Sequence, residues 1–333
     1  MDKIDIVYLW VDGTDKKWRD AKHEWALKIK GQEYKQTTAA GDERYRDNGE
    51  LMYSLRSVAE CAPWVNHIYI ITDFDQVPRW LNTKHPKITI VPHSDIIPTD
   101  VRPTFNSNTI EMFLHNISGL SEHFLLMNDD MFMNRKLSPS FFFNKHGQAR
   151  TLCVSRRPKH NIGYWLDNTD DYRSTLILSA KLIHDIYGKK MYGLSPSHGI
   201  DPYIKSSYIK CRNHPMIKPL IDKQVHNKFR TNWELQRWIF TLYNSVHKHG
   251  KLCKSYPYKS GHYRILDTVY NILHWRKTKQ SSYVCPRVIG HEKSLKRAAT
   301  FCINDSCNNT PEMLRANINF LQQRFPTKSE FEK

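Results

Sequence analysis

The chain has 333 residues, 40% of them hydrophobic and 12% aromatic, which is enough for a sizeable core in one large domain or two closely packed halves. Lysine and arginine number 50 against 33 acidic residues, a formal net charge of +17, which favours polyanionic partners. The sequence lacks zinc-finger spacing, an RNP-like aromatic motif and a basic zipper, so we expect no nucleic-acid partner.

The start of the chain and its cysteines indicate a cellular compartment. Residue 5 already lies in an apolar strand pattern, so we expect no secretory signal, and no window reaches about 18 consecutive apolar residues. The seven cysteines are odd in number and form no CxxC pair, as in a reduced, cytoplasmic protein. Cys302 and Cys307 could pair, bind a metal or remain free thiols, and free thiols are our expectation.

The first 135 residues alternate between strand and helix patterns. Apolar runs predict strands at 4–10, 67–72, 88–91 and 123–127. Amphipathic spacing predicts helices at 15–30, from Asp47 or Asn48 as N-cap to Pro63, and at 106–117. This alternation predicts a Rossmann-like, mostly parallel α/β sheet flanked by helices.

The second half is less regular. Helices are predicted at 176–186, at 232–247 and at 311–325, the last with Thr310 as N-cap and Pro311 in the first position. The segment 195–203 (SPSHGIDPY) holds two prolines and a glycine and is expected to begin as a loop. We expect one catalytic domain, with an α/β half at 1–135 that binds the nucleotide sugar and a mainly helical half at 136–333.

Polar side chains follow two of the predicted strands, where open α/β sheets bind their ligands. Asp12 and Gly13 come after the first strand, and Asn128-Asp129-Asp130 follow the fourth directly. Adjacent carboxylates at the end of an apolar strand need a cation or strong donors, and Mg²⁺ or Mn²⁺ prefers such oxygen ligands. The alternative is that the two aspartates only cap the next turn.

Other candidates are weaker when taken alone. His198 lies in the Pro/Gly-rich segment and could act as a general acid or base, although most of the 17 histidines will be inert. Arg230 could clamp a phosphate, and Glu111 could be either a site residue or a surface charge. Asn304 and Asp305 offer an amide and a carboxylate, but Asn-Asp-Ser also favours a turn.

Four blocks of sequence, taken in order, carry a family resemblance. The first is 4–15 (IDIVYLWVDGTD), and the second runs from Arg44 (RYRDNGELMYSLRSV) to Asn128-Asp129-Asp130. The third holds His198 and Phe229-Arg230, and the fourth is 302–305 (CIND) with the closing helix. Together they resemble the Stealth family, the sugar-1-phosphate transferases of bacterial capsule and exopolysaccharide synthesis, which includes the catalytic core of the animal enzyme that makes the lysosomal mannose-6-phosphate tag.

The resemblance implies a glycosyltransferase-A-like core and a specific reaction. Sugar-1-phosphate would pass from a UDP-sugar, a UDP-N-acetylhexosamine or UDP-hexose, to a hydroxyl of a glycan or phosphopolysaccharide acceptor, with release of UMP. The implied catalytic set is Glu111, Asp130, His198 and Arg230. Asp130, with Asn304 or Asp305, would hold Mg²⁺ or Mn²⁺. The remaining residues of the implied donor pocket are Asp12, Gly13, Arg44, Asp47 and Asn48.

Physical chemistry is consistent with these implied roles. Phosphoryl transfer needs charge neutralisation and in-line positioning. His198 is our expected base because the ordinary pKa of a histidine lies near working pH, and Asp130 is the second candidate. A conventional metal-dependent glycosyltransferase releasing UDP is the alternative function, and a basic polyanion-binding module without catalysis is a further one. The net charge also favours peripheral contact with the inner face of the cell membrane through the basic 245–280 region.

Overall fold

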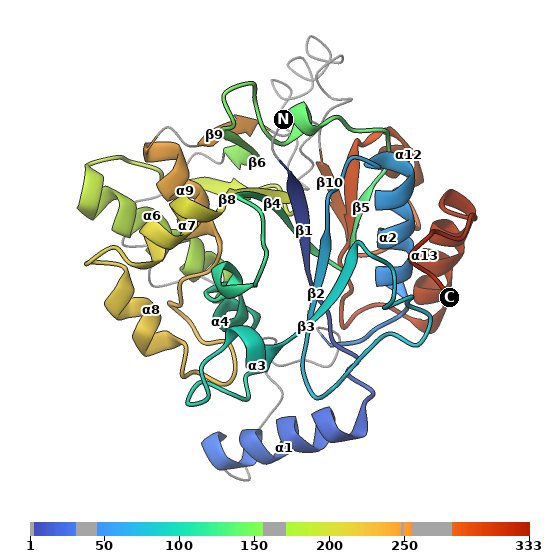
Figure 1. The fold of residues 1–333 in the computed structure, drawn as a ribbon, viewed down its shortest axis with the longest axis horizontal. Helices are drawn as coiled ribbons and strands as arrows, with labels where there is room; N and C mark the ends of the chain where they lie inside the picture. The colour runs from blue at the N-terminus through green and yellow to red at the C-terminus, as the bar shows by residue number, and fades with distance from the viewer. Residues whose placement is uncertain (1–2, 31–44, 156–170, 248–249, 255–281) are drawn as a thin grey trace.

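The computed structural model describes residues 3–30, 45–155, 171–247, 250–254 and 282–333, and a five-stranded sheet forms its centre (Figure 1). The strand order is β3-β2-β1-β4-β8. β1 (Ile4–Leu9), β2 (Ile68–Thr72), β3 (Ile88–Pro92) and β4 (His123–Asn128) are parallel, and β8 (Asp201–Ile204) pairs antiparallel with β4. The predicted fold class, a mostly parallel sheet flanked by helices, is confirmed.

The two faces of the sheet pack against different helices. Along β1, Ile6 and Tyr8 belong to a core that includes α2 (Glu50–Cys61), whereas Val7 belongs to the core on the opposite face. This alternation follows from the two-residue period of a strand. Helices cover both faces of the sheet, so both faces are apolar. The opposite face is covered by α6 (Asp171–Tyr187), α7 (Lys205–Arg212), α8 (Lys218–Gln224) and α9 (Trp238–Val246) (Figure 1).

Two smaller sheets complete the described chain. β5 (Met131–Met133) pairs with β11 (Thr300–Ile303), which pairs in turn with β10 (Ser282–Cys285). β6 (Ala149–Ser155) lies between β7 (Leu194–Pro196) and β9 (Gly250–Lys254). Around them lie α1 (Lys16–Lys30), α3 (His93–Ile96), α4 (Ser107–Glu111), η3 (Leu114–Asn116), η4 (Pro139–Phe141), α12 (Glu292–Arg297) and α13 (Pro311–Arg324).

Most predicted elements are present, and the differences have local causes. The helix predicted at 106–117 is broken into α4 and η3, because Met112, Phe113, Leu114 and Ile117 are all buried and cannot share one helical face. α2 begins after Gly49 (φ 90°), not after Asp47 or Asn48, since the Asp47 carboxylate accepts the Gly49 N–H. α13 has Thr310 as N-cap and Pro311 first, as predicted.

Two expectations for the second half were wrong. The helix predicted from residue 232 begins at Trp238, because Gln224 accepts the Leu235 N–H and holds the preceding segment in a non-helical path. The segment 195–203, expected to begin as a loop, begins instead with the last two residues of β7, and β8 follows from Asp201.

The two predicted halves interlock through the central sheet. Residues 136–333 carry more helix than strand among the described residues, but they also form β6 to β11, and β8 joins the central sheet beside β4. The described part of 136–333 thus combines helices with strands. Within the described residues no helix combines the length and apolar character that a bilayer crossing needs. Arg44 and most of the basic 245–280 region lie outside the described residues.

Candidate active site

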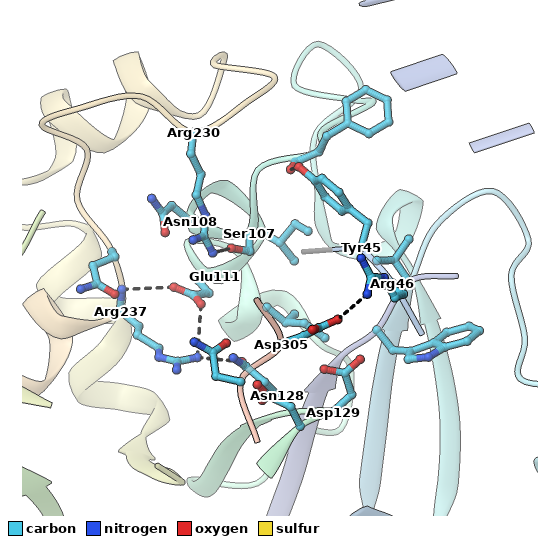
Figure 2. Close-up of a pocket in the computed structure, with 18 of the residues that line it drawn as sticks. Tyr45, Arg46, Ser107, Asn108, Glu111, Asn128, Asp129, Arg230, Arg237 and Asp305 are labelled. Carbon is cyan, nitrogen blue, oxygen red and sulfur yellow. Dashed lines mark hydrogen bonds and ion pairs between the residues drawn. The ribbon is translucent and has the colours of Figure 1, made fainter. Parts of the chain in front are cut away.

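A cavity of about 710 Å³ opens where the carboxyl ends of the parallel strands meet the second half of the chain (Figure 2). This is the edge at which open α/β sheets bind ligands. The strands and the residues directly after them contribute Leu9, Trp10, Ile71, Asp73, His93, Asn128, Asp129 and Asp130. The later segments contribute Tyr172, Pro196, His198, Arg230, Gln236, Arg237, Asn304 and Asp305.

Three carboxylates crowd the end of β4. Burial, together with the neighbouring charge of Asp130, raises the pKa of Asp129 well above its usual range. Burial also raises the pKa of Asp130 to about 6 and that of Glu50, at the start of α2, to about 7. Such a cluster disfavours full ionisation until a cation arrives.

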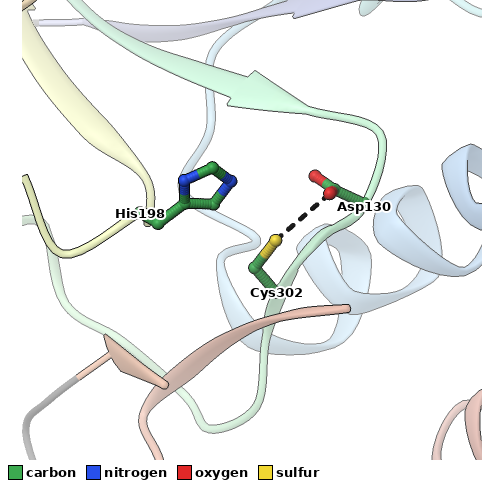
Figure 3. Close-up of side chains that lie close together, drawn as sticks. All are labelled: Asp130, His198 and Cys302. Atoms are coloured by element: carbon green, nitrogen blue, oxygen red, sulfur yellow. Dashed lines mark hydrogen bonds between the residues drawn. The ribbon is translucent and has the colours of Figure 1, made fainter. Parts of the chain in front are cut away.

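Asp130, His198 and Cys302 lie together, each with a ligand atom within 4.8 Å of those of the other two (Figure 3). The Cys302 thiol donates to Asp130 Oδ2 at 3.2 Å. Burial, with Arg237 and Arg230 nearby, lowers the pKa of His198 to about 4, so its imidazole is neutral at pH 7. His198 also has a φ of 53°, a backbone conformation that non-glycine residues rarely adopt and that clusters at functional sites.

Arginines approach this acidic end from two directions (Figure 2). Arg230 donates to the Ser107 hydroxyl at the start of α4. Arg46 forms an ion pair with Asp305 at 3.3 Å. The cavity therefore combines guanidinium groups, which suit phosphate oxygens, with carboxylates, which suit a cation.

Arg237 forms the most buried ionic contacts of the site. Its Nη1 lies 3.3 Å from Glu111 Oε1 and 3.1 Å from Asn128 Oδ1, and its Nε lies 3.1 Å from Asp201 Oδ2. Its backbone N–H donates to Glu111 Oε2 at 3.3 Å. Burial raises the pKa of Asp201 to about 6, although Arg237 opposes the shift.

The structure brings the four predicted catalytic residues to one cavity. Glu111, Asp130, His198 and Arg230 all line it, although they are spread over four separate segments. Asn304 and Asp305 line it too. Asp305 is already engaged, however, because it pairs with Arg46 and accepts Ser306 N at 2.7 Å and Asn309 Nδ2 at 2.9 Å.

Four of the predicted donor-pocket residues are not part of the cavity lining, namely Asp12, Gly13, Asp47 and Asn48, and the fifth, Arg44, lies outside the described residues. The Asp12 carboxylate accepts from the backbone and hydroxyl of Thr14, and Gly13 donates its N–H to Tyr45 O at 2.8 Å. A Cβ at Gly13 would meet that oxygen at 2.2 Å, so the close approach demands glycine. Asp47 accepts from the Trp10 indole at 3.2 Å, and Asn48 donates to Glu50 at 2.7 Å.

Sequence reasoning missed Arg46, Glu50, Asp201 and Arg237. Arg46 and Glu50 stand within the same block as Arg44, Asp47 and Asn48, so their position in that motif was a usable signal. Arg237 carried no such signal, because its partners Glu111, Asn128 and Asp201 are remote in sequence and only the fold brings them together.

The donor set fits a hard divalent cation. Asp130 Oδ1 is buried and finds no hydrogen-bond partner within the described part of the chain, and the half-buried Asp129 precedes it directly. Burial and the nearby Asp130 charge raise the pKa of Cys302 well above its usual range, so it serves Asp130 as a neutral thiol donor. The carboxylate oxygens of Asp130 and Asp129 are ligands of the kind that Mg²⁺ and Mn²⁺ prefer, and the neutral imidazole of His198 lies within ligand distance of Asp130.

Comparisons with known proteins identify the family of the chain. Two family models match, described as Stealth protein conserved region 2 over residues 44–151 and Stealth protein conserved region 1 over residues 2–29. A solved structure of an active-site mutant of LgtC superposes over 96% of this chain and 94% of its own at 10% identity, with a TM-score of 0.43, which is only a distant likeness.

Curated relatives extend the match beyond those regions. Capsular polysaccharide phosphotransferase fcs1 of Haemophilus influenzae is 30% identical, over 95% of this chain and 82% of its own length. WcwK of Streptococcus pneumoniae, of the same description, is 30% identical over the full length of both. Exopolysaccharide phosphotransferase cps2G of Lactiplantibacillus plantarum is 44% identical over 45% of this chain, which covers 42% of that relative. The chain therefore belongs to the Stealth family and, like these phosphotransferase relatives, is a transferase.

Proposed function

We propose that this enzyme transfers sugar-1-phosphate from a UDP-sugar to a hydroxyl of a glycan acceptor in capsule or exopolysaccharide synthesis, forming a phosphodiester and releasing UMP. The donor sugar would be an N-acetylhexosamine or a hexose, and the acceptor a glycan or phosphopolysaccharide. The observation that carries the proposal is the meeting of buried carboxylates, a neutral histidine and arginines in one cavity at the ends of the parallel strands.

The proposed step balances without a covalent enzyme intermediate. The acceptor oxygen bonds to the phosphorus next to the donor sugar, and the bond from that phosphorus to the bridging diphosphate oxygen breaks. UMP leaves with the bridging oxygen, and the anomeric C–O bond stays intact. The hydroxyl proton passes to His198, whose neutral imidazole has a lone pair to accept it at pH 7. Asp130, with its pKa near 6, is the second candidate for that proton.

Charge is managed by the residues around the diphosphate. Arg230, held by Ser107, takes up phosphoryl charge from one side of the cavity, and Arg46 lies on the other. Asp130 would hold Mg²⁺ or Mn²⁺, with Asp129, Asn304 or Asp305 as neighbours. When bound, the ion neutralises diphosphate oxygens and so stabilises the charge that develops during transfer.

The released nucleotide tests the proposal. Purified protein is incubated with Mg²⁺ or Mn²⁺, a panel of UDP-sugars and a glycan acceptor, and the nucleotide is separated by chromatography. We expect UMP and a product with one phosphorus per transferred sugar. Release of UDP with a phosphorus-free product would instead identify a conventional glycosyltransferase.

Location follows from the same chemistry. We propose that the enzyme works in the cytoplasm, in contact with the anionic inner face of the membrane, because its net charge of +17 suits such a surface. The basic 245–280 region would make the contact. A nucleic-acid partner is not part of the proposal.

A further inference from the structure

Asn128 stands at the last position of β4, directly before the acidic pair, and lines the cavity. Its Oδ1 accepts from Arg237 Nη1 at 3.1 Å. A guanidinium can only donate hydrogen bonds, so the amide oxygen must face Arg237 and the amide nitrogen must face away. In the part of the chain that the structure describes, the Asn128 Nδ2 has no hydrogen-bond partner and is not buried.

Arg237 is fixed from three directions, which makes it a rigid support for this amide. Glu111 on α4 binds both its Nη1 and its backbone N–H, and Asp201 on β8 binds its Nε. Only 11% of the Arg237 side chain is exposed. A buried cation that serves two carboxylates holds its geometry well, since breaking either contact would leave a buried charge uncompensated.

Arg237 differs in its contacts from Arg230, another of the arginines that line the cavity. Arg230 lines the cavity and donates to the neutral hydroxyl of Ser107. The charge of Arg237 is balanced by Glu111 and Asp201, so it has little to offer a phosphate.

We infer that Arg237 is a positioning residue, which holds the amide oxygen of Asn128 and so aims the amide N–H group of Asn128 at a phosphoryl oxygen of the ligand. The inference rests on the proposed function for the identity of that ligand. Asn128 then supplies a neutral donor among carboxylates that would otherwise repel the diphosphate. The bond is formed with an anion, which makes it stronger than one between neutral groups.

Two substitutions of Asn128 test the donor. Asn128→Leu keeps the approximate size and removes the N–H without adding charge, and Asn128→Asp keeps the contact with Arg237 but removes the N–H. Affinity for UDP, for inorganic pyrophosphate and for uridine is measured by calorimetry with Mg²⁺ present. We expect both variants to bind UDP and pyrophosphate about 10- to 100-fold more weakly, the aspartate variant the more so, with uridine affinity within about twofold of wild type.

Arg237→Lys tests the positioning. A lysine ammonium cannot reach Glu111, Asn128 and Asp201 in the planar fork that a guanidinium offers. We expect weaker binding of UDP and pyrophosphate at unchanged uridine affinity, and a smaller further loss when Arg237→Lys is added to Asn128→Leu, because both act through one amide.

The outcomes separate the inference from the function on which it rests. The role of Asn128 is overturned if Asn128→Leu binds UDP and pyrophosphate as tightly as the wild type does. It is also overturned if the affinity of this variant for uridine falls as much as its affinity for UDP. A fall in melting temperature for Arg237→Lys with UDP affinity unchanged overturns the role of Arg237. If the wild-type protein binds pyrophosphate but not UDP, the proposed donor is contradicted. The role of Asn128 is then tested by the pyrophosphate affinities of the variants. Wild-type protein that binds neither overturns both.

Discussion

Asp130 is a carboxylate that the fold buries beside a histidine and a thiol. Its raised pKa means that ionising it at pH 7 costs free energy in the folded protein, and Cys302 offsets only part of that cost. Active-site groups held in this way trade stability for function. Asp130, which we expect to hold the metal, should therefore lower the free energy of unfolding of the metal-free protein.

Replacing Asp130 by Asn should raise stability and abolish activity. In buffer at pH 7 that contains a metal chelator, we expect the free energy of unfolding of Asp130→Asn to exceed that of the wild type by roughly 1–3 kcal/mol, because the buried charge is gone. An acid whose folded pKa lies near 6, above its ordinary value of 3.8, costs stability above that folded pKa, and the cost fades as pH falls towards 4. The gain should therefore shrink over the same range. Denaturant unfolding of both proteins at pH 4 to 7 checks this, and a variant less stable at pH 7 would contradict it.

His198 is neutral at working pH, which is the state that a general base needs. We expect His198→Ala to lower kcat for UMP release by about 10²- to 10⁴-fold, the usual contribution of a positioned base. The exposed His146 provides the control, since His146→Ala should keep wild-type turnover. Near-normal turnover of His198→Ala would transfer the role of base to Asp130.

Two loops contribute residues to the cavity lining, and each is held in place by contacts of a single residue. Gly13, in the loop after β1, approaches the backbone of Tyr45, which lines the cavity. Gly13→Ala would place its Cβ 2.2 Å from Tyr45 O, so a backbone segment must move. We expect a loss of roughly 1–3 kcal/mol in stability and weaker UDP binding, measured by thermal unfolding and calorimetry. A wild-type melting temperature would show that the loops separate freely.

The second loop, 227–234, carries Arg230 and is tied to the start of α4 by Glu234. This side chain is 2% exposed and accepts hydrogen bonds from Asn106, Asn108, Asn227 and Thr231, all at 2.9–3.1 Å. Glu234 therefore connects the loop of Arg230 with the segment that leads to Ser107 and Glu111.

Glu234→Gln should loosen that connection, because its amide N–H would face donors and leave them unpaired. We expect a loss of about 1–3 kcal/mol in stability and a raised KM for the donor, since Arg230 is no longer held. Asp222→Asn is the matched control: its carboxylate is exposed and pairs with Lys218 and Arg212, so its removal should change stability by less than about 1 kcal/mol. Equal effects of the two substitutions would contradict the assignment.

At the scale of the whole molecule, the net charge of +17 predicts association with anionic surfaces. We expect the protein to float with vesicles that contain anionic lipid at low salt and to stay in solution at about 1 M salt, where the screening length is only ~3 Å. Vesicles of neutral lipid are the control. Flotation that survives high salt, or occurs equally with neutral lipid, would indicate apolar insertion and contradict an electrostatic contact.

The sequence by itself determined the central sheet, because each parallel strand is an apolar run bounded by turn residues and both of its faces are buried. It also predicted α1 and α13, whose periodicity and caps are local properties. Family motifs added Glu111, His198 and Arg230, which no local pattern distinguishes from other polar residues, whereas the adjacent carboxylates after the fourth predicted strand already indicated Asp130. Elements whose form depends on distant partners, such as α4 and the start of α9, were predicted less well.

Only the tertiary structure decided how the site residues pair. The contact of Cys302 with Asp130 and the contacts of Arg237 with Glu111, Asn128 and Asp201 join segments that are remote in the chain. β8 enters the central sheet from the second half and brings Asp201 with it. Burial then sets which groups are ionised, because desolvation depends on everything packed around a side chain and not on its neighbours in sequence.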